Sequence, residues 1–213
     1  MQIDSNLQKG YQKALELAIE NLKSVDPQEI AQSCGAEYDS QSRIFKLEYL
    51  KDVYAISPIT GQTTKESSSE EVPLTTKVLL LNYLISARAQ TPTGNLIAFR
   101  DIPGAATYEP SFQKRAVLPL IKAFDGKPEM LYMVGQMLGG SKADVADASV
   151  KIRVLPLFEI TYAIWHSDDE FPAHGTILFD SSVRRLMTAE CIVVAASNGV
   201  YKMMGLARSL SSS

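Results

Sequence analysis

The sequence has few of the residues that usually mark secreted, metal-binding or redox proteins. Its 213 residues include two cysteines, Cys34 and Cys191, and two histidines, His166 and His174. Two thiols so far apart are typical of reduced core residues and favour a cytoplasmic location. The motifs HExxH, CxxC and GxSxG do not occur. The common signatures of zinc proteases, redox dithiols and serine hydrolases are therefore missing.

The sequence also lacks an excess of charge and any long apolar run. Lysine plus arginine number 21 against 24 acidic residues, for a formal net charge of -3. Such a balance does not attract phosphate backbones or anionic lipids. The longest uncharged apolar runs, residues 78–87 and 191–201, are far shorter than the roughly 20 residues that span a bilayer. No basic region followed by an apolar stretch opens the chain. We expect a soluble protein without nucleic-acid or membrane partners.

What is present is typical of one globular domain. The hydrophobic fraction of 46% and the charged fraction of 21% are ordinary globular values. A chain of this length buries enough surface to fold around one core without disulfides or metals. We expect a single domain over residues 1–210, followed by a serine tail, residues 211–213, that frays.

The first half of the chain predicts helices before strands. Apolar residues recur at helical spacing over residues 11–25. Asp26 and Pro27 then predict the start of a second helix, which ends near Gly35. Residues 44–56 alternate as a hairpin, and the polar residues 62–71 predict an exposed loop or edge ribbon. The run of residues 78–85 is apolar nearly all round, which places that helix centrally.

The second half predicts more strands and three further helices. A strand is expected at residues 96–99, and helices at 111–124 and 128–138, with Pro119 kinking or splitting the first of these. Alternating strands follow at 150–154 and 158–164, then a strand at 176–179 and a helix from Thr188. This order lacks the regular strand-helix alternation of a doubly wound sheet. The sequence therefore predicts an α+β fold with an antiparallel or mixed sheet and helices packed on it.

One motif imitates a phosphate-binding loop. Residues 135–142, GQMLGGSK, have glycines at the required spacing, but the lysine follows the serine. The segment also ends a predicted helix, whereas a phosphate-binding loop opens one. We therefore interpret it as a helix C-cap.

The densest polar cluster lies between two predicted strands. Residues 165–174 hold both histidines and three consecutive acids, Asp168, Asp169 and Glu170. Such a cluster can ligate a divalent metal or divide acid and base roles. It can equally be a solvated turn, since neighbouring side chains on an extended chain point to opposite sides. Binding of a small ligand or partner is the third reading, and Trp165 and Phe171 are expected to anchor the loop in the core.

A second cluster, residues 99–108, follows a strand and a turn. Arg100 could pair with one acid of the 168–170 run, because a guanidinium suits a carboxylate bidentately. We therefore predict a pocket between residues 99–108 and 165–174. Its candidate ligand-binding residues are Arg100, Tyr108, Trp165, His166, Asp168, Asp169 and Glu170.

Five segments in the same order resemble one known family. They are EVPLT (71–75), LLLNYL (79–84), GNLIAFR (94–100), DDEFP (168–172) and ILFD (177–180). Together they resemble the bacterial and archaeal family catalogued as domain of unknown function 3786. The resemblance extends from about Tyr11 to Glu190. Asn82 and Leu96 stand where the family's usual pattern has a histidine and a tryptophan.

The resemblance implies no established activity. Members occur mostly in anaerobes, and some look fused to iron-sulfur modules of the corrinoid-protein type. This chain carries no such module, and two cysteines cannot build a four-thiolate cluster. Any iron-sulfur or corrinoid group would belong to a separate partner protein.

The sequence thus favours a cytoplasmic binding or accessory domain, which we expect to work with such a partner, and it assigns no cofactor. The alternative is an enzyme of unknown reaction, in which Asp168, Asp169 or Glu170 serves as general base or metal ligand with help from His166 or His174. A structural subunit of a larger assembly is a third class, which an exposed apolar patch would reveal.

Overall fold

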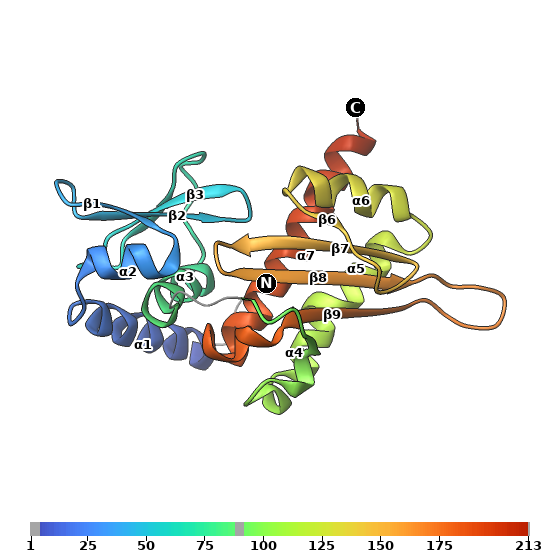
Figure 1. The fold of residues 1–213 in the computed structure, drawn as a ribbon, viewed down its shortest axis with the longest axis horizontal. Helices are drawn as coiled ribbons and strands as arrows, with labels where there is room; N and C mark the ends of the chain where they lie inside the picture. Colours follow the sequence, from blue (N-terminus) through green and yellow to red (C-terminus); the bar gives the residue numbers. More distant parts are fainter. Residues whose placement is uncertain (1–4, 88–91, 213) are drawn as a thin grey trace. The chain divides into compact units, whose positions relative to one another are not determined.

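The computed structural model describes residues 5–87 and 92–212, which form two compact units (Figure 1). Unit 1 comprises Met1–Thr91, Leu155–Leu157 and Arg185–Met187, and unit 2 comprises Pro92–Val154, Phe158–Arg184 and Thr188–Ser213. Each unit has its own antiparallel sheet with helices, so the predicted α+β class is confirmed. The single domain over residues 1–210 stays a prediction, and the units are described separately.

Unit 1 combines a four-stranded sheet with helices. The sheet has the order β1-β2-β3-β4. The helices are α1 (Ser5–Leu22), α2 (Pro27–Cys34) and α3 (Leu74–Ser86), and the strands are β1 (Glu37–Asp39), β2 (Ile44–Tyr49), β3 (Asp52–Ile56) and β4 (Thr63–Lys65). The predicted hairpin is β2-β3, and part of the polar segment is the edge strand β4. These predictions are confirmed.

Capping residues explain where helix α2 of unit 1 begins and ends, and apolar residues explain why α3 is buried. Asp26 accepts a hydrogen bond from the Gln28 N–H at 2.7 Å, and Pro27 opens α2. Gly35 ends that helix in the left-handed region, with φ of 75°. The central helix α3 buries Leu79, Leu80, Leu81, Tyr83 and Leu84 completely. The all-round apolar pattern therefore correctly predicted a core helix.

Unit 2 has a five-stranded sheet of order β5-β9-β8-β7-β6. The strands are β5 (Leu96–Ala98), β6 (Ser141–Lys142), β7 (Ala148–Leu155), β8 (Phe158–Trp165) and β9 (His174–Asp180). The α-helices are α4 (Glu109–Phe112), α5 (Leu118–Phe124), α6 (Pro128–Met137) and α7 (Ala189–Ser211). Helix α7 begins after Thr188, as predicted. It includes Ser211, the first residue of the tail that was expected to fray, and Ser213 lies outside the described residues.

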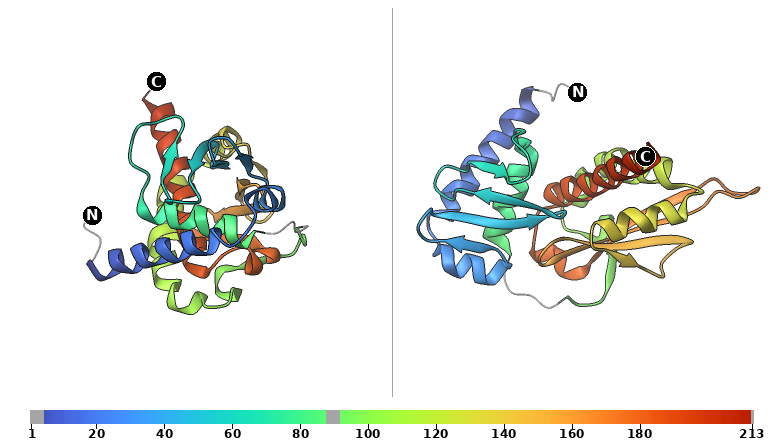
Figure 2. Two further views of the ribbon diagram at one scale, coloured as in Figure 1. Left: turned by 90° about the vertical axis from the view of Figure 1, so that its left-hand side faces the viewer. Right: turned by 90° about the horizontal axis from the view of Figure 1, so that it is seen from above.

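Helices cover one face of this sheet. Tyr162 of β8 lies against Gly199 of α7, and Gly175 of β9 lies against Ile121 of α5. These two strand residues share a face, because Tyr162 pairs with Ile177, two positions from Gly175. Both α5 and α7 therefore pack on the same side of the sheet, next to one another (Figures 1 and 2).

The helix predicted over residues 111–124 is split, as Pro119 led us to expect. Helix α4 passes into a π-helical turn, η3 (Gln113–Val117), and α5 begins at Leu118 with Pro119 in its first turn. A proline in the first turn removes no intrahelical hydrogen bond, whereas one in the middle of a helix would. The π turn widens the helix at Lys114, and such turns are frequent at functional sites.

The segment that imitates a phosphate-binding loop lies at the end of helix α6. Residues 135–142 end α6, with Gly139 at φ of 71° and the Gly140 N–H donating to the Gly135 carbonyl at 2.8 Å. The C-cap interpretation of the phosphate-loop-like motif is thus confirmed.

Within residues 5–87 and 92–212, no helix combines the length and hydropathy that crossing a bilayer requires.

Candidate functional site

The acidic segment forms the tip of the β8-β9 hairpin, where the ladder ends at the Trp165–His174 pair. Asp168 accepts hydrogen bonds from the N–H groups of Phe171, at 2.7 Å, and Glu170, at 2.9 Å. These bonds favour the ionised carboxylate and lower the pKa of Asp168. The Asp168 side chain therefore closes its own turn, as the solvated-turn reading predicts.

The aromatic residues that flank the acids do not anchor the tip. Phe171 is 67% exposed and Trp165 is 37% exposed. The Trp165 ring packs on the His174 ring instead, with 5.6 Å between centroids. The predicted anchoring of Phe171 in the core is wrong, because the tip extends past the end of the ladder, where no core is within reach (Figure 1).

His166 fixes the base of the hairpin to the end of α5. The Gly126 N–H donates to His166 Nδ1 at 3.0 Å. Asp125 Oδ1 lies 3.4 Å from the same Nδ1 and accepts the Ser167 N–H at 3.1 Å. The N–H and hydroxyl of Ser167 lower the pKa of Asp125. This cluster has a structural role in holding the hairpin.

The ion pair predicted between Arg100 and the acidic segment is absent. Arg100 lies exposed in a 3-10 turn, η1 (Phe99–Asp101), and makes no ion pair with any acid of the described chain. The pairing of β5 ends at Ala98 and Leu178, four residues or about 13 Å short of the last hairpin pair. The chain then turns out of the sheet before it reaches the tip.

Tyr108 is hydrogen-bonded to the first turn of helix α7. Its hydroxyl donates to Glu190 Oε2 at 3.3 Å, and burial, followed by the Glu190 charge, raises the pKa of Tyr108. Asp169 and Glu170 are exposed at the tip. Over residues 5–87 and 92–212, no three His, Cys, Asp or Glu side chains come together as metal ligands. Ligand binding by the residues named from the sequence stays a prediction.

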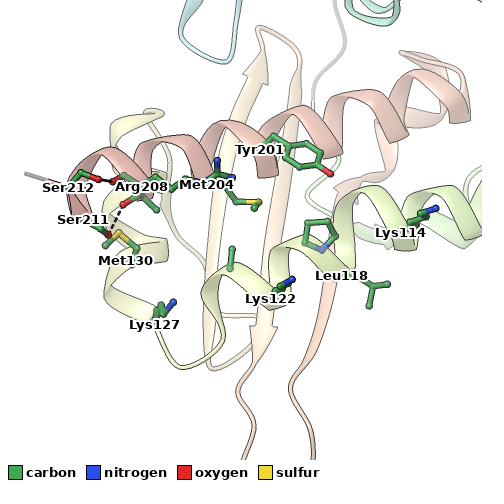
Figure 3. A pocket seen from close by; sticks show the side chains of 13 residues that line it. Lys114, Leu118, Lys122, Lys127, Met130, Tyr201, Met204, Arg208, Ser211 and Ser212 are labelled. Carbon is green, nitrogen blue, oxygen red and sulfur yellow. Dashed lines mark hydrogen bonds between the residues drawn. The ribbon is translucent and has the colours of Figure 1, made fainter. Parts of the chain in front are cut away.

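A groove on unit 2 offers a different candidate site (Figure 3). It has a volume of about 960 Å³, within the range of ligand pockets. Lys114 of η3, helix α5, the loop that follows it and the start of α6 form one wall, and the second half of α7 forms the other. Its apolar lining consists of Leu118, Pro119, Ala123, Met130, Tyr201, Met204 and Ala207. Two of these side chains are prominent, because Leu118 is 58% and Tyr201 is 52% exposed.

Four cations surround this apolar lining. They are Lys114, Lys122, Lys127 and Arg208. Their side chains make no hydrogen bond or ion pair with other described residues, and none of the groove's thirteen lining side chains is acidic. The remaining polar lining, Ser211 and Ser212, donates hydroxyls to the carbonyls of Ala207 and Arg208. The groove is thus an apolar surface with uncompensated positive charge.

The sequence analysis missed the groove, although its signal is present. Lys114, Leu118 and Lys122 recur four residues apart, which places them on one face of a helix. On the C-terminal helix, Tyr201, Met204 and Arg208 recur at spacings of three and four. Each pattern alone describes an ordinary half-exposed helix. Only the packing of α5 beside α7 brings the two faces together.

Comparison with known proteins adds a family but no activity. A family model described as a domain of unknown function (DUF3786) matches residues 26–202. No curated protein and no solved structure matches the chain.

Proposed function

Because the chain belongs to the domain of unknown function 3786 family, which carries no assigned activity, we propose its function from geometry: it is a binding module. The groove between α5 and α7 takes an organic anion with an apolar body, such as a carboxylate or phosphate attached to a hydrocarbon or ring system. The cations of the groove meet the anionic group, and Leu118, Tyr201 and Met204 contact the apolar body.

One observation carries this proposal, namely four cations without partners around an exposed apolar lining. Like charges gathered on one surface repel each other, and an exposed apolar surface has unfavourable contact with water. An anion relieves the repulsion, and an apolar body covers Leu118 and Tyr201. A ligand with both properties gains from both effects, whereas a purely ionic ligand leaves the apolar lining exposed.

The test uses anilinonaphthalene sulfonate, an anionic aromatic probe whose fluorescence rises in apolar surroundings. We expect saturable binding to the full chain. The double substitution Lys122→Glu with Lys127→Glu replaces attraction of the anion by repulsion at two positions. The interaction energy of two unit charges 4 Å apart in water is about 1 kcal/mol, so we expect the affinity for the probe to fall about tenfold or more. Tyr201→Ser removes apolar contact and lowers the fluorescence of the bound probe.

The control is Arg100→Glu, which reverses an exposed, unpaired cation outside the groove. It leaves binding unchanged if the groove is the site. Loss of binding in Arg100→Glu with full binding in the lysine variant would instead favour the loops around residues 99–108 and 165–174. Circular dichroism of each variant checks that it is folded.

A separate iron-sulfur or corrinoid partner, an anaerobic source and a cytoplasmic location are further parts of the proposal. The partner and the source rest on the family resemblance. The location is supported by Cys34 and Cys191, which are buried and form no disulfide in the described chain. Thermal shift with a corrinoid and with divalent ions tests the partner class, and a shift with the corrinoid that the groove variant loses would support it.

A further inference from the structure

The tip of the β8-β9 hairpin carries negative charge beside an exposed aromatic side chain, whereas the groove carries positive charge. Asp168, Asp169 and Glu170 give it three consecutive negative charges, and Phe171 beside them is 67% exposed. Asp169 and Glu170 make no ion pair with another described residue. The groove has four unpaired cations and an exposed apolar lining. The two surfaces are therefore complementary in both charge and hydrophobicity.

The tip also has a defined shape. The Asp168 carboxylate binds the N–H groups of Glu170 and Phe171, and the Asp168 N–H donates to the Phe171 carbonyl at 3.0 Å. These bonds form a closed turn over residues 168–171, in the loop between β8 and β9 that extends beyond the sheet (Figure 1). A preformed turn loses less conformational entropy on binding than a flexible segment does.

We propose that the groove's partner is the hairpin tip of a second copy of this chain. This inference rests on the proposed function, because the tip is itself an anionic segment with an apolar side chain. Asp169 and Glu170 meet the groove's lysines, and Phe171 contacts Leu118 and Tyr201. A closed pair, in which each tip occupies the other copy's groove, is the smallest assembly that leaves neither surface unoccupied.

Sedimentation velocity of the full chain tests the proposal. We expect the mass to rise with concentration from 23.4 kDa towards twice that value. Reversing the tip with Asp169→Lys and Glu170→Lys, or the groove with Lys122→Glu and Lys127→Glu, leaves each variant monomeric at concentrations where the native chain pairs. The matched control, Glu70→Lys with Asp144→Lys, reverses two exposed acids outside both surfaces and leaves pairing unchanged.

Mixing the two reversed variants provides the decisive step. A positive tip then meets a negative groove at one contact, and the native charges meet at the other, so the mixture pairs although neither variant does alone. A native chain that stays monomeric, a tip variant that pairs like the native chain, or a mixture that stays monomeric would each overturn the proposal.

The same variants separate this inference from the proposed function. The tip variant has an intact groove and is expected to bind anilinonaphthalene sulfonate at least as well as the native chain. If the tip variant binds the probe but the native chain does not pair, only the second-copy partner is wrong. If the probe fails to bind the monomeric tip variant, the groove itself is not the site.

Discussion

Asp180 is a residue whose ionised form the described fold stabilises. Its carboxylate, at the end of β9, accepts hydrogen bonds from the N–H groups of Gly94 at 2.7 Å, Ser182 at 2.9 Å and Thr93 at 3.1 Å. Partial burial opposes ionisation, but the bonds from Ser182, Thr93 and Gly94 outweigh it and lower the pKa of Asp180 to about 2. The ionised side chain thus ties the start of β5 to the end of β9.

This gives a pH-dependent prediction. The ordinary pKa of the carboxyl is 3.8, so its contribution to stability is complete above about pH 4 and is lost as the pH falls towards 2. Asp180→Asn is expected to lower the free energy of unfolding by about 1–2 kcal/mol at pH 6, and by much less at pH 2.5. Urea unfolding at the two pH values measures the difference. Asp144→Asn, at an exposed position, is the control, and an equal loss at both pH values would contradict this role for Asp180.

At the scale of the element, α7 carries two glycines in different surroundings. At Gly199 the Tyr162 ring lies so close that an added Cβ would overlap its hydroxyl oxygen, and Tyr162 is completely buried. At Gly205 nothing lies within 4 Å of an added Cβ. The first glycine allows close packing of α7 on β8, whereas the second only lowers helix propensity.

Alanine at these two positions is therefore expected to have opposite effects. Gly199→Ala forces α7 and Tyr162 apart and lowers the free energy of unfolding by about 1–3 kcal/mol. Gly205→Ala raises it by up to about 1 kcal/mol, because alanine restricts the unfolded chain and favours the helix. Urea midpoints of the two variants compare them directly. Destabilisation of similar size at both positions would show that α7 does not pack on Tyr162 in this way.

Helix ends were predicted correctly where they depend on residues close together in the sequence. The cap at Asp26, the stop at Gly35 and the split near Pro119 each depend on residues within a few positions, and all three are present. The short strands β1 and β6 were missed, because two or three residues carry no periodic pattern. In the hairpin turn, Leu50 and Lys51 adopt positive φ values of 50° and 66°, which their residue types do not favour.

The candidate site could not be predicted in the same way, because it depends on which distant elements pack together. The sequence correctly placed Arg100 after a strand and the acids between strands. It could not show that β5 turns away at Phe99, or that the acidic tip projects past the sheet. The two walls of the groove are about 80 residues apart in the chain, and neither wall alone has an unusual sequence.

At the scale of the whole molecule, the chain crosses between the two units repeatedly. Leu155–Leu157, the last residue of β7 and the turn before β8, belongs to unit 1, as does Arg185–Met187, which precedes α7. In unit 1 the Tyr83 hydroxyl donates to the Cys34 carbonyl at 2.7 Å and accepts the Leu157 N–H at 3.0 Å. Unfolding of unit 1 therefore releases the turn that connects two strands of unit 2.

This connectivity leads us to expect one cooperative unfolding transition, in agreement with the single domain predicted from the sequence. Differential scanning calorimetry measures it, with equal calorimetric and van't Hoff enthalpies as the expected result. Tyr83→Phe leaves the Leu157 N–H without its acceptor and is expected to lower the midpoint while the transition stays single. Two separate transitions in the native chain would mean that the units fold independently.

The central claim, that the groove of unit 2 is a binding site for an apolar anion, is tested most directly by amide-resolved NMR during titration with dodecyl phosphate below its micelle concentration. We predict saturable shifts that cluster at Lys122, Lys127, Tyr201, Met204 and Arg208, the residues on the two walls of the groove. Shifts that cluster instead around Arg100, Tyr108 and residues 165–174, or no saturable shifts at all, would contradict the claim.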